Sequence, residues 1–138
     1  MGLLDKFTKK AAEDVFPYPK FEEWLNGVFE KSFPRDVIAV NFNIYEDADN
    51  YWSIEPVGTA SFEEEDEDWA CDEVTNFNTR SNPFTWQEKA SWEDMLSKVK
   101  NMIIQYLDSG KHAGKLKTLD AVACGFVDGN LEILYKKR

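Results

Sequence analysis

The chain has 138 residues, of which 43% are hydrophobic and 14% aromatic, and its formal net charge is −10 at pH 7. This length predicts one domain over residues 1–138, and so many large apolar side chains exclude a disordered tail. An acidic chain repels phosphates, which argues against nucleic-acid binding. We find neither an apolar run of membrane-helix length nor a secretion signal, and therefore expect a cytoplasmic protein.

The first part of the chain is expected to contain two helices. Over residues 3–15, apolar side chains recur at helical spacing with lysines between them, which predicts an amphipathic helix loosely attached within residues 1–16. This helix either docks on its own domain or lies on a membrane surface. Residues 21–33 predict a second helix with a wide apolar stripe, which ends before Pro34.

A β section follows the second helix. Apolar and polar residues alternate over residues 37–45, and residues 51–57 return as a strand after a polar turn at 46–50. Pro56 has no N–H for a sheet ladder, so we expect this strand to lie at an edge or to bend. Residues 63–68 form an acidic run, residues 69–77 are a candidate third strand, and residues 79–85 are assigned to a loop.

The last part of the chain predicts a helix and a hairpin. Residues 91–109 carry a continuous apolar stripe, with Ser91 placed to cap the helix and Gly110 to end it. The Asp128–Gly129 pair predicts a two-residue turn. That turn places Phe126 opposite Leu131, Cys124 opposite Ile133 and Val122 opposite Tyr135. Small residues on the other side leave room for a second helix of the domain or for an outside partner; they are Ala121, Ala123 and Gly125.

Together these elements predict an α+β fold. Short connections favour an antiparallel sheet of four to five strands, with helices packed mainly on one face. The chain contains two cysteines, Cys71 and Cys124, which we interpret as buried free thiols in a reducing compartment.

The negative charge is concentrated in one segment. Between Arg35 and Arg80 the sequence has 13 of its 26 acidic residues and no Lys or Arg, so this segment carries −13 and the remaining residues sum to +3. Tryptophans lie among these acids, as at interfaces where aromatic anchors have a charged rim. A solvated acidic loop without a function is the alternative. The predicted partner-binding surface comprises Glu46, Asp47, Asp49, Trp52, Glu63, Glu64, Asp66, Glu67, Asp68, Trp69, Asp72 and Glu73.

The sequence predicts no cofactor, no metal and no catalytic residue. A calcium loop starting at Asp47 would need Gly and Glu at its sixth and twelfth places, which hold Trp52 and Gly58. The single His112 has no ligand or catalytic companion at a recognisable spacing. Two alternatives to a binding protein stay open: a small hydrolase that uses carboxylates and His112, and an adaptor that dimerises through a strand edge.

Four stretches of the chain resemble small bacterial immunity proteins of polymorphic or contact-dependent toxin systems. They are residues 42–45 (FNIY), 52–58 (WSIEPVG), 68–73 (DWACDE) and 125–135 (GFVDGNLEILY). The resemblance implies a non-catalytic monomer or homodimer that binds a cognate toxin domain, often a basic nuclease, and blocks its active site. It assigns no role to individual residues.

Overall fold

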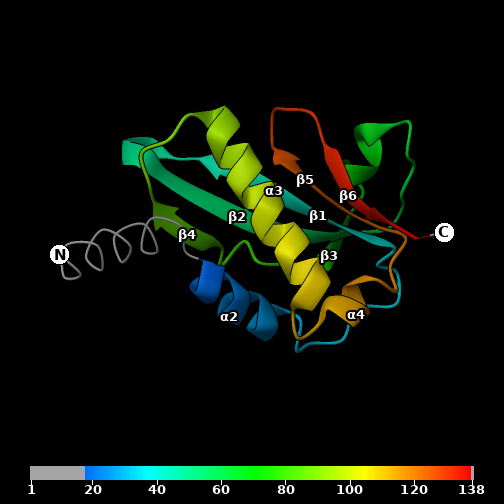
Figure 1. The fold of residues 1–138 in the computed structure, drawn as a ribbon. Coiled ribbons are helices and arrows are strands. Elements are labelled where there is room, and N and C mark those ends of the chain that lie inside the picture. The colour runs from blue at the N-terminus through cyan, green and yellow to red at the C-terminus, as the bar shows by residue number, and fades with distance from the viewer. Residues whose placement is uncertain (1–17, 138) are drawn as a thin grey trace.

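The computed structural model describes residues 18–137, which form a six-stranded sheet with helices (Figure 1). The α+β class is confirmed, whereas the helix expected at residues 3–15 lies outside the described part. The elements in chain order are α2 (Tyr18–Val28), β1 (Ala39–Glu46), the 3-10 helix η1 (Ala48–Asn50), β2 (Tyr51–Thr59), the 3-10 helix η2 (Glu67–Cys71), β3 (Glu73–Asn78), β4 (Phe84–Gln87), α3 (Trp92–Ser109), α4 (Ala113–Leu116), β5 (Ala121–Phe126) and β6 (Glu132–Lys136).

The sheet is mixed, so the expected purely antiparallel sheet of four to five strands is wrong. The strand order is β3-β2-β1-β5-β6, and β4 also pairs with β2. β5 runs parallel to β1, in a register from Ala39 opposite Ala121 to Ile44 opposite Phe126. The connection from β4 to β5 contains α3 and α4, and a connection of this length lets β5 enter beside β1 in the same direction.

β2 lies inside the sheet, so of the two alternatives expected for Pro56, an edge position or a bend, the edge position is wrong. The pairing of β2 with β3 does have a register shift between Val57 and Thr59. Along one side it pairs with β1; along the other it pairs with β4 up to Ile54 and with β3 from Val57 onward. Pro56 falls between these two partners, where neither β3 nor β4 is paired with it. β2 therefore accommodates Pro56 although the strand lies inside the sheet. Proline has no N–H to donate, and on this side of β2 no described strand is paired at Pro56 to accept one.

The larger hydrophobic core lies on the helix-bearing face of the sheet. α3 crosses this face in Figure 1, and the buried side chains of α2 and α3 pack there against Val40, Phe42 and Ile44 of β1. A smaller cluster on the opposite face joins Ala39, Ala121 and Ala123 to Trp69 of η2. The space beside the small β5 residues is thus occupied by an element of the same domain.

The C-terminal hairpin departs from its predicted register near the tip. Val122 does pair with Tyr135, but Cys124 pairs with Glu132 instead of Ile133, and the register shifts between Val122 and Ala123. Among the described residues, positive φ occurs only at Asp49 and Asn50 of the β1–β2 turn. The expected tight turn at 128–129 is therefore replaced by a longer loop over residues 127–131, called the β5–β6 loop below.

The other predicted elements are mostly present with altered bounds. The Ser91 side chain caps α3 by accepting a hydrogen bond from the Asp94 N–H at 3.1 Å, as expected. Gly110 ends this helix in an extended conformation, and a Cβ there would lie 2.5 Å from the Tyr106 ring. The helix expected at 21–33 spans Tyr18–Val28, the candidate strand at 69–77 divides into η2 and β3, and the expected loop at 79–85 contains the start of β4.

The two cysteines differ in accessibility, which corrects the expectation that both are buried. Cys71 is exposed, while Cys124 is buried in β5, and burial raises the pKa of the Cys124 thiol to about 12. The thiolate is the reactive form. We therefore expect a thiol reagent at pH 8 to modify one equivalent in the native protein and two in urea. A Cys71→Ser variant should show no native modification; rapid native labelling of Cys124 would contradict this assignment.

Candidate protein-binding surface

The fold separates the acidic segment into two groups. Glu46, Asp47 and Asp49 lie at the β1–β2 turn, beside the end of β1. The acidic loop, defined as residues 63–68, leads into η2 on the face of the sheet opposite the main core. The sequence thus predicted the exposure of these carboxylates, but it did not predict that they occupy two places.

The two tryptophans predicted as partner anchors are buried. Trp52 is 1% exposed in the larger core, where its Nε1 donates a hydrogen bond to the Glu88 carbonyl oxygen at 2.7 Å. Trp69 is 4% exposed in the smaller cluster and packs edge-on against Phe62 at 5.1 Å. They stabilise opposite faces of the sheet, so neither indole is available to a partner; the anchor role predicted for them is corrected.

Most predicted acidic site residues face solvent without a cation. Within residues 18–137, Glu64 pairs with Lys136 at 2.7 Å and Glu73 pairs with Arg80. Three other predicted acids accept hydrogen bonds from uncharged groups of the same domain instead. Asp47 accepts from the Ser53 hydroxyl, Asp66 from the Asp68 N–H, and Glu67 from the Leu131 N–H. These bonds fix the turn, η2 and the β5–β6 loop while leaving their negative charge uncompensated.

An exposed tryptophan that the sequence did not single out lies beside the β5–β6 loop. Trp92, the first residue of α3, is 53% exposed and contacts Phe126 edge-on at 6.2 Å. A hollow of about 340 Å³, here called the Trp92 hollow, is lined by Glu46, Trp92, Phe126, Asp128 and Gly129. The apolar stripe of residues 91–109 includes Trp92, but this side chain, at the first position of α3, is not covered by the rest of the described domain.

A second hollow lies on the other side of the same loop. This asparagine hollow, of about 400 Å³, has Asn41, Asn43 and Tyr45 of β1 in its lining and acidic side chains from η2 and β3. The Tyr45 hydroxyl donates to the buried Glu55 carboxylate at 3.4 Å, and burial together with this negative charge raises the pKa of Tyr45. The lining acids are Glu67, Asp68 and Glu73.

His112 pairs with an acid away from these hollows. Its Nε2 lies 2.7 Å from Glu30 Oε2, and this contact is the largest cause that lowers the pKa of Glu30. Neither the Trp92 hollow nor the asparagine hollow includes His112, nor does a third one between α2 and the β3–β4 segment. The geometry does not bring His112 together with a buried acid at any of these three places.

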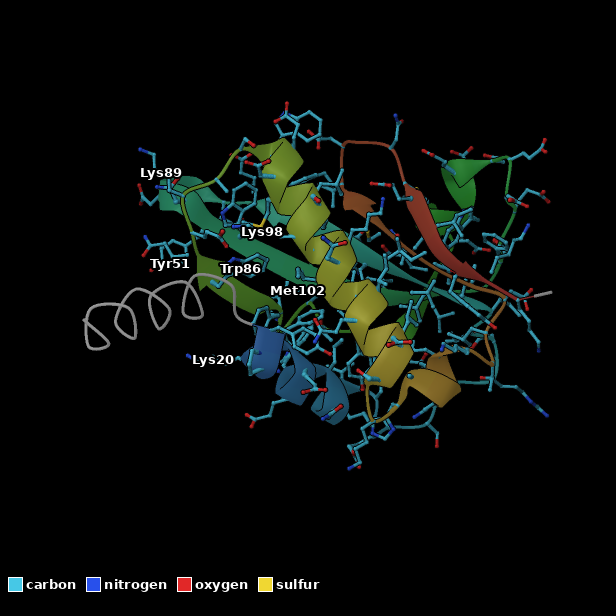
Figure 2. All side chains as sticks on the ribbon, in the orientation of Figure 1. Lys20, Tyr51, Trp86, Lys89, Lys98 and Met102 are labelled. Carbon is cyan, nitrogen blue, oxygen red and sulfur yellow. The ribbon has the colours of Figure 1, made fainter. Side chains whose placement is uncertain are left out.

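The two buried carboxylates of the described chain have structural partners. Glu55 faces Arg80 at 3.5 Å. Glu88 forms an ion pair with Lys98 and accepts from Trp86 Nε1 at 3.2 Å; Figure 2 shows Lys98 on α3 close to Trp86 on β4. Both acids hold neighbouring segments together, and these pairings account for their burial.

Residues 18–137 contain no helix that is long and apolar enough to cross a bilayer. In the same range, no group of three or more His, Cys, Asp or Glu side chains is arranged to hold a metal ion. Compared with known proteins, the chain matches no protein-family model, no curated protein and no solved structure.

Proposed function

We propose that this chain is a non-catalytic protein that binds a basic protein through the surface around the β5–β6 loop. The observation that supports it most is Trp92, a large aromatic side chain left half exposed between carboxylates. Glu46 and Asp128 share its hollow, and Glu93 and Asp94 follow it in the first turn of α3. Binding hot spots are enriched in tryptophan, and a charged rim speeds association with an oppositely charged partner.

The apolar part of this surface is larger than one side chain. Val127 is also exposed, and Phe126 is only partly buried beneath Trp92. An adjoining hollow extends the same surface along α3 to Leu96 and Glu132. Covering these groups would remove apolar area from water, while the surrounding carboxylates favour lysines and arginines on the other protein.

In its specific form, the proposal is an immunity protein that neutralises a cognate basic toxin at one-to-one stoichiometry. The resemblance in the sequence motivates this form, and the acidic surface fits a basic toxin domain. A hydrolase receives less support, since His112 and the buried acids lie in separate pairs. An adaptor that dimerises through β6 would use the backbone edge of that strand instead of Trp92.

The test starts from a partner captured at low salt from the cells that encode the chain, then purified and titrated. We expect binding to weaken as salt rises, and Trp92→Ala to weaken it by about 2 kcal/mol, roughly 30-fold. A Glu46→Lys/Asp128→Lys variant should reduce the association rate strongly. Asp36→Lys/Asp108→Lys is the matched control, because it makes the same charge change at exposed sites elsewhere.

Three results would reject the proposal. The first is unchanged affinity in Trp92→Ala, since the exposed indole would then contribute nothing. The second is an equal loss in the control variant, because the attraction would then depend on net charge and not on this surface. The third is that no captured protein binds in pure form.

A further inference from the structure

The asparagine hollow is lined by polar side chains of β1, which lie beside small residues of the neighbouring strand β5. Side chains alternate along β1, so Asn41, Asn43 and Tyr45 share the face opposite the main core. The β5 residues paired with the two asparagines are Ala123 and Gly125. These carry little or no side chain, and the β5–β6 loop lies over Gly125, where an added Cβ would meet the Asn130 carbonyl oxygen at 2.6 Å. The hollow lies between this loop and η2.

Asn41, which belongs to the lining of this hollow, carries one polar atom without a partner in the described chain. Asn41 is 1% exposed, and its Nδ2 donates to Asn43 Oδ1 at 2.8 Å. Its own Oδ1 is buried and accepts no hydrogen bond from any described residue. A buried acceptor without a donor is costly, so the position favours a ligand that brings an N–H or O–H group.

The negative charge of the residues that line the hollow favours a donor group that is positively charged. Asp68 has no ion-pair partner among the described residues, and Glu67 uses Oε2 for the Leu131 N–H, which leaves Oε1. Glu73 already holds the Arg80 guanidinium at this rim. Anions are therefore disfavoured, while a cation with several donors could satisfy an amide oxygen and carboxylates together. A guanidinium presents five N–H donors in a planar fork, which suits this arrangement better than an ammonium.

We infer that the asparagine hollow is a receptor for one arginine side chain of the basic partner. In this arrangement the guanidinium donates to Asn41 Oδ1 and to the carboxylates of Glu67 and Asp68, while Ala70 and Leu131 contact its methylene stem. The inference rests on the proposed function. Because both hollows share Phe126 and Gly129, one partner straddling the β5–β6 loop would reach Trp92 on one side and this receptor on the other.

The test titrates the full ¹⁵N-labelled chain with N-acetyl-arginine methylamide, followed by NMR. The matched probe is the citrulline derivative, which has nearly the same shape but no charge. We expect saturable shifts in the millimolar range at residues 41–45 and 67–73, including the side-chain amide signals of Asn41 and Asn43. Citrulline should cause at least about tenfold weaker binding, because charge-assisted hydrogen bonds are lost.

Variants locate the contact within the acidic surface. Glu67→Gln/Asp68→Asn should lower arginine affinity at least about tenfold and keep the fold, since glutamine can still accept from the Leu131 N–H. Glu63→Gln/Glu65→Gln removes the same charge from the acidic loop outside the hollow and should retain binding. Equal binding of citrulline, unsaturable shifts spread over all acidic residues, or equal loss in both variants would overturn the inference.

The inference and the proposed function fail in different ways. If Trp92→Ala weakens the partner and Glu67→Gln/Asp68→Asn does not, the binding function stands and the arginine receptor is wrong. If arginine saturates the hollow but no basic protein depends on Trp92, the receptor stands and its assignment to that partner surface is wrong.

Discussion

Replacing Trp52 with alanine is expected to destabilise the protein by about 3–5 kcal/mol. The side chain is 1% exposed, contacts Phe126 at 6.1 Å between ring centroids, and gives its indole N–H to the Glu88 carbonyl. Alanine would leave a cavity and an unpaired buried carbonyl oxygen at the junction of β2 and the segment after β4. Both losses act on the folded state, so the variant should unfold at lower urea concentration.

Trp92→Ala is the matched control for this experiment. Its indole is half exposed and also contacts Phe126, at 6.2 Å between ring centroids. An exposed substitution usually changes stability by within about 0.5 kcal/mol, so its unfolding curve should lie close to that of the wild type. If Trp92→Ala were as destabilising as Trp52→Ala, Trp92 would be a core residue and the proposed binding surface would lose its anchor.

This contrast shows how far the sequence could locate the site. Charge counting found the acidic segment, since a long run without Lys or Arg stays acidic in any fold. Which tryptophan is exposed depends on how the helices pack on the sheet, and charge counting does not show this. Alternation already put Trp52 on the same strand face as Ile54, which is a core pattern. Trp92 belongs to the apolar stripe of α3 and is nevertheless 53% exposed at the first position of that helix.

The fold shows the same division between local and non-local information. The Ser91 cap and the stripe of α3 were predicted because they depend on residues within a few positions of one another. The parallel β1–β5 pair was not, because no local pattern specifies which distant strand enters beside β1. β4 was missed because it has only four residues, too few for alternation to stand out after Pro83.

The hairpin tip shows tertiary contacts overriding a strong turn signal. Leu131 packs in the smaller cluster with Trp69, and its N–H donates to the Glu67 carboxylate at 3.2 Å. These contacts with η2 hold residue 131 away from the position that a two-residue turn would give it. The register shift between Val122 and Ala123 then restores pairing farther from the tip. The same contacts shape both hollows of the proposed binding surface.

Removing the Lys98 ammonium is expected to destabilise the fold by about 2 kcal/mol. The Glu88 side chain is 2% exposed and faces Lys98 across the α3–β4 contact, so Lys98→Met would leave a buried carboxylate without this cation. Breaking a fully buried pair costs about 3–5 kcal/mol, but the Lys98 side chain keeps 35% of its surface exposed, and solvent screening lowers the value. Methionine preserves the packing of the aliphatic stem.

A double-mutant cycle separates the ion pair from other contacts of Lys98. Glu88→Gln removes the charge while retaining an oxygen that can accept from Trp86 Nε1. If Glu88 is a structural anion, Glu88→Gln combined with Lys98→Met should be more stable than Lys98→Met alone by about 1 kcal/mol in urea unfolding. Strictly additive losses would show that the two charges are not coupled. The ion pair with Lys98 would then not explain why Glu88 is buried. The hydrolase alternative would have to be considered again.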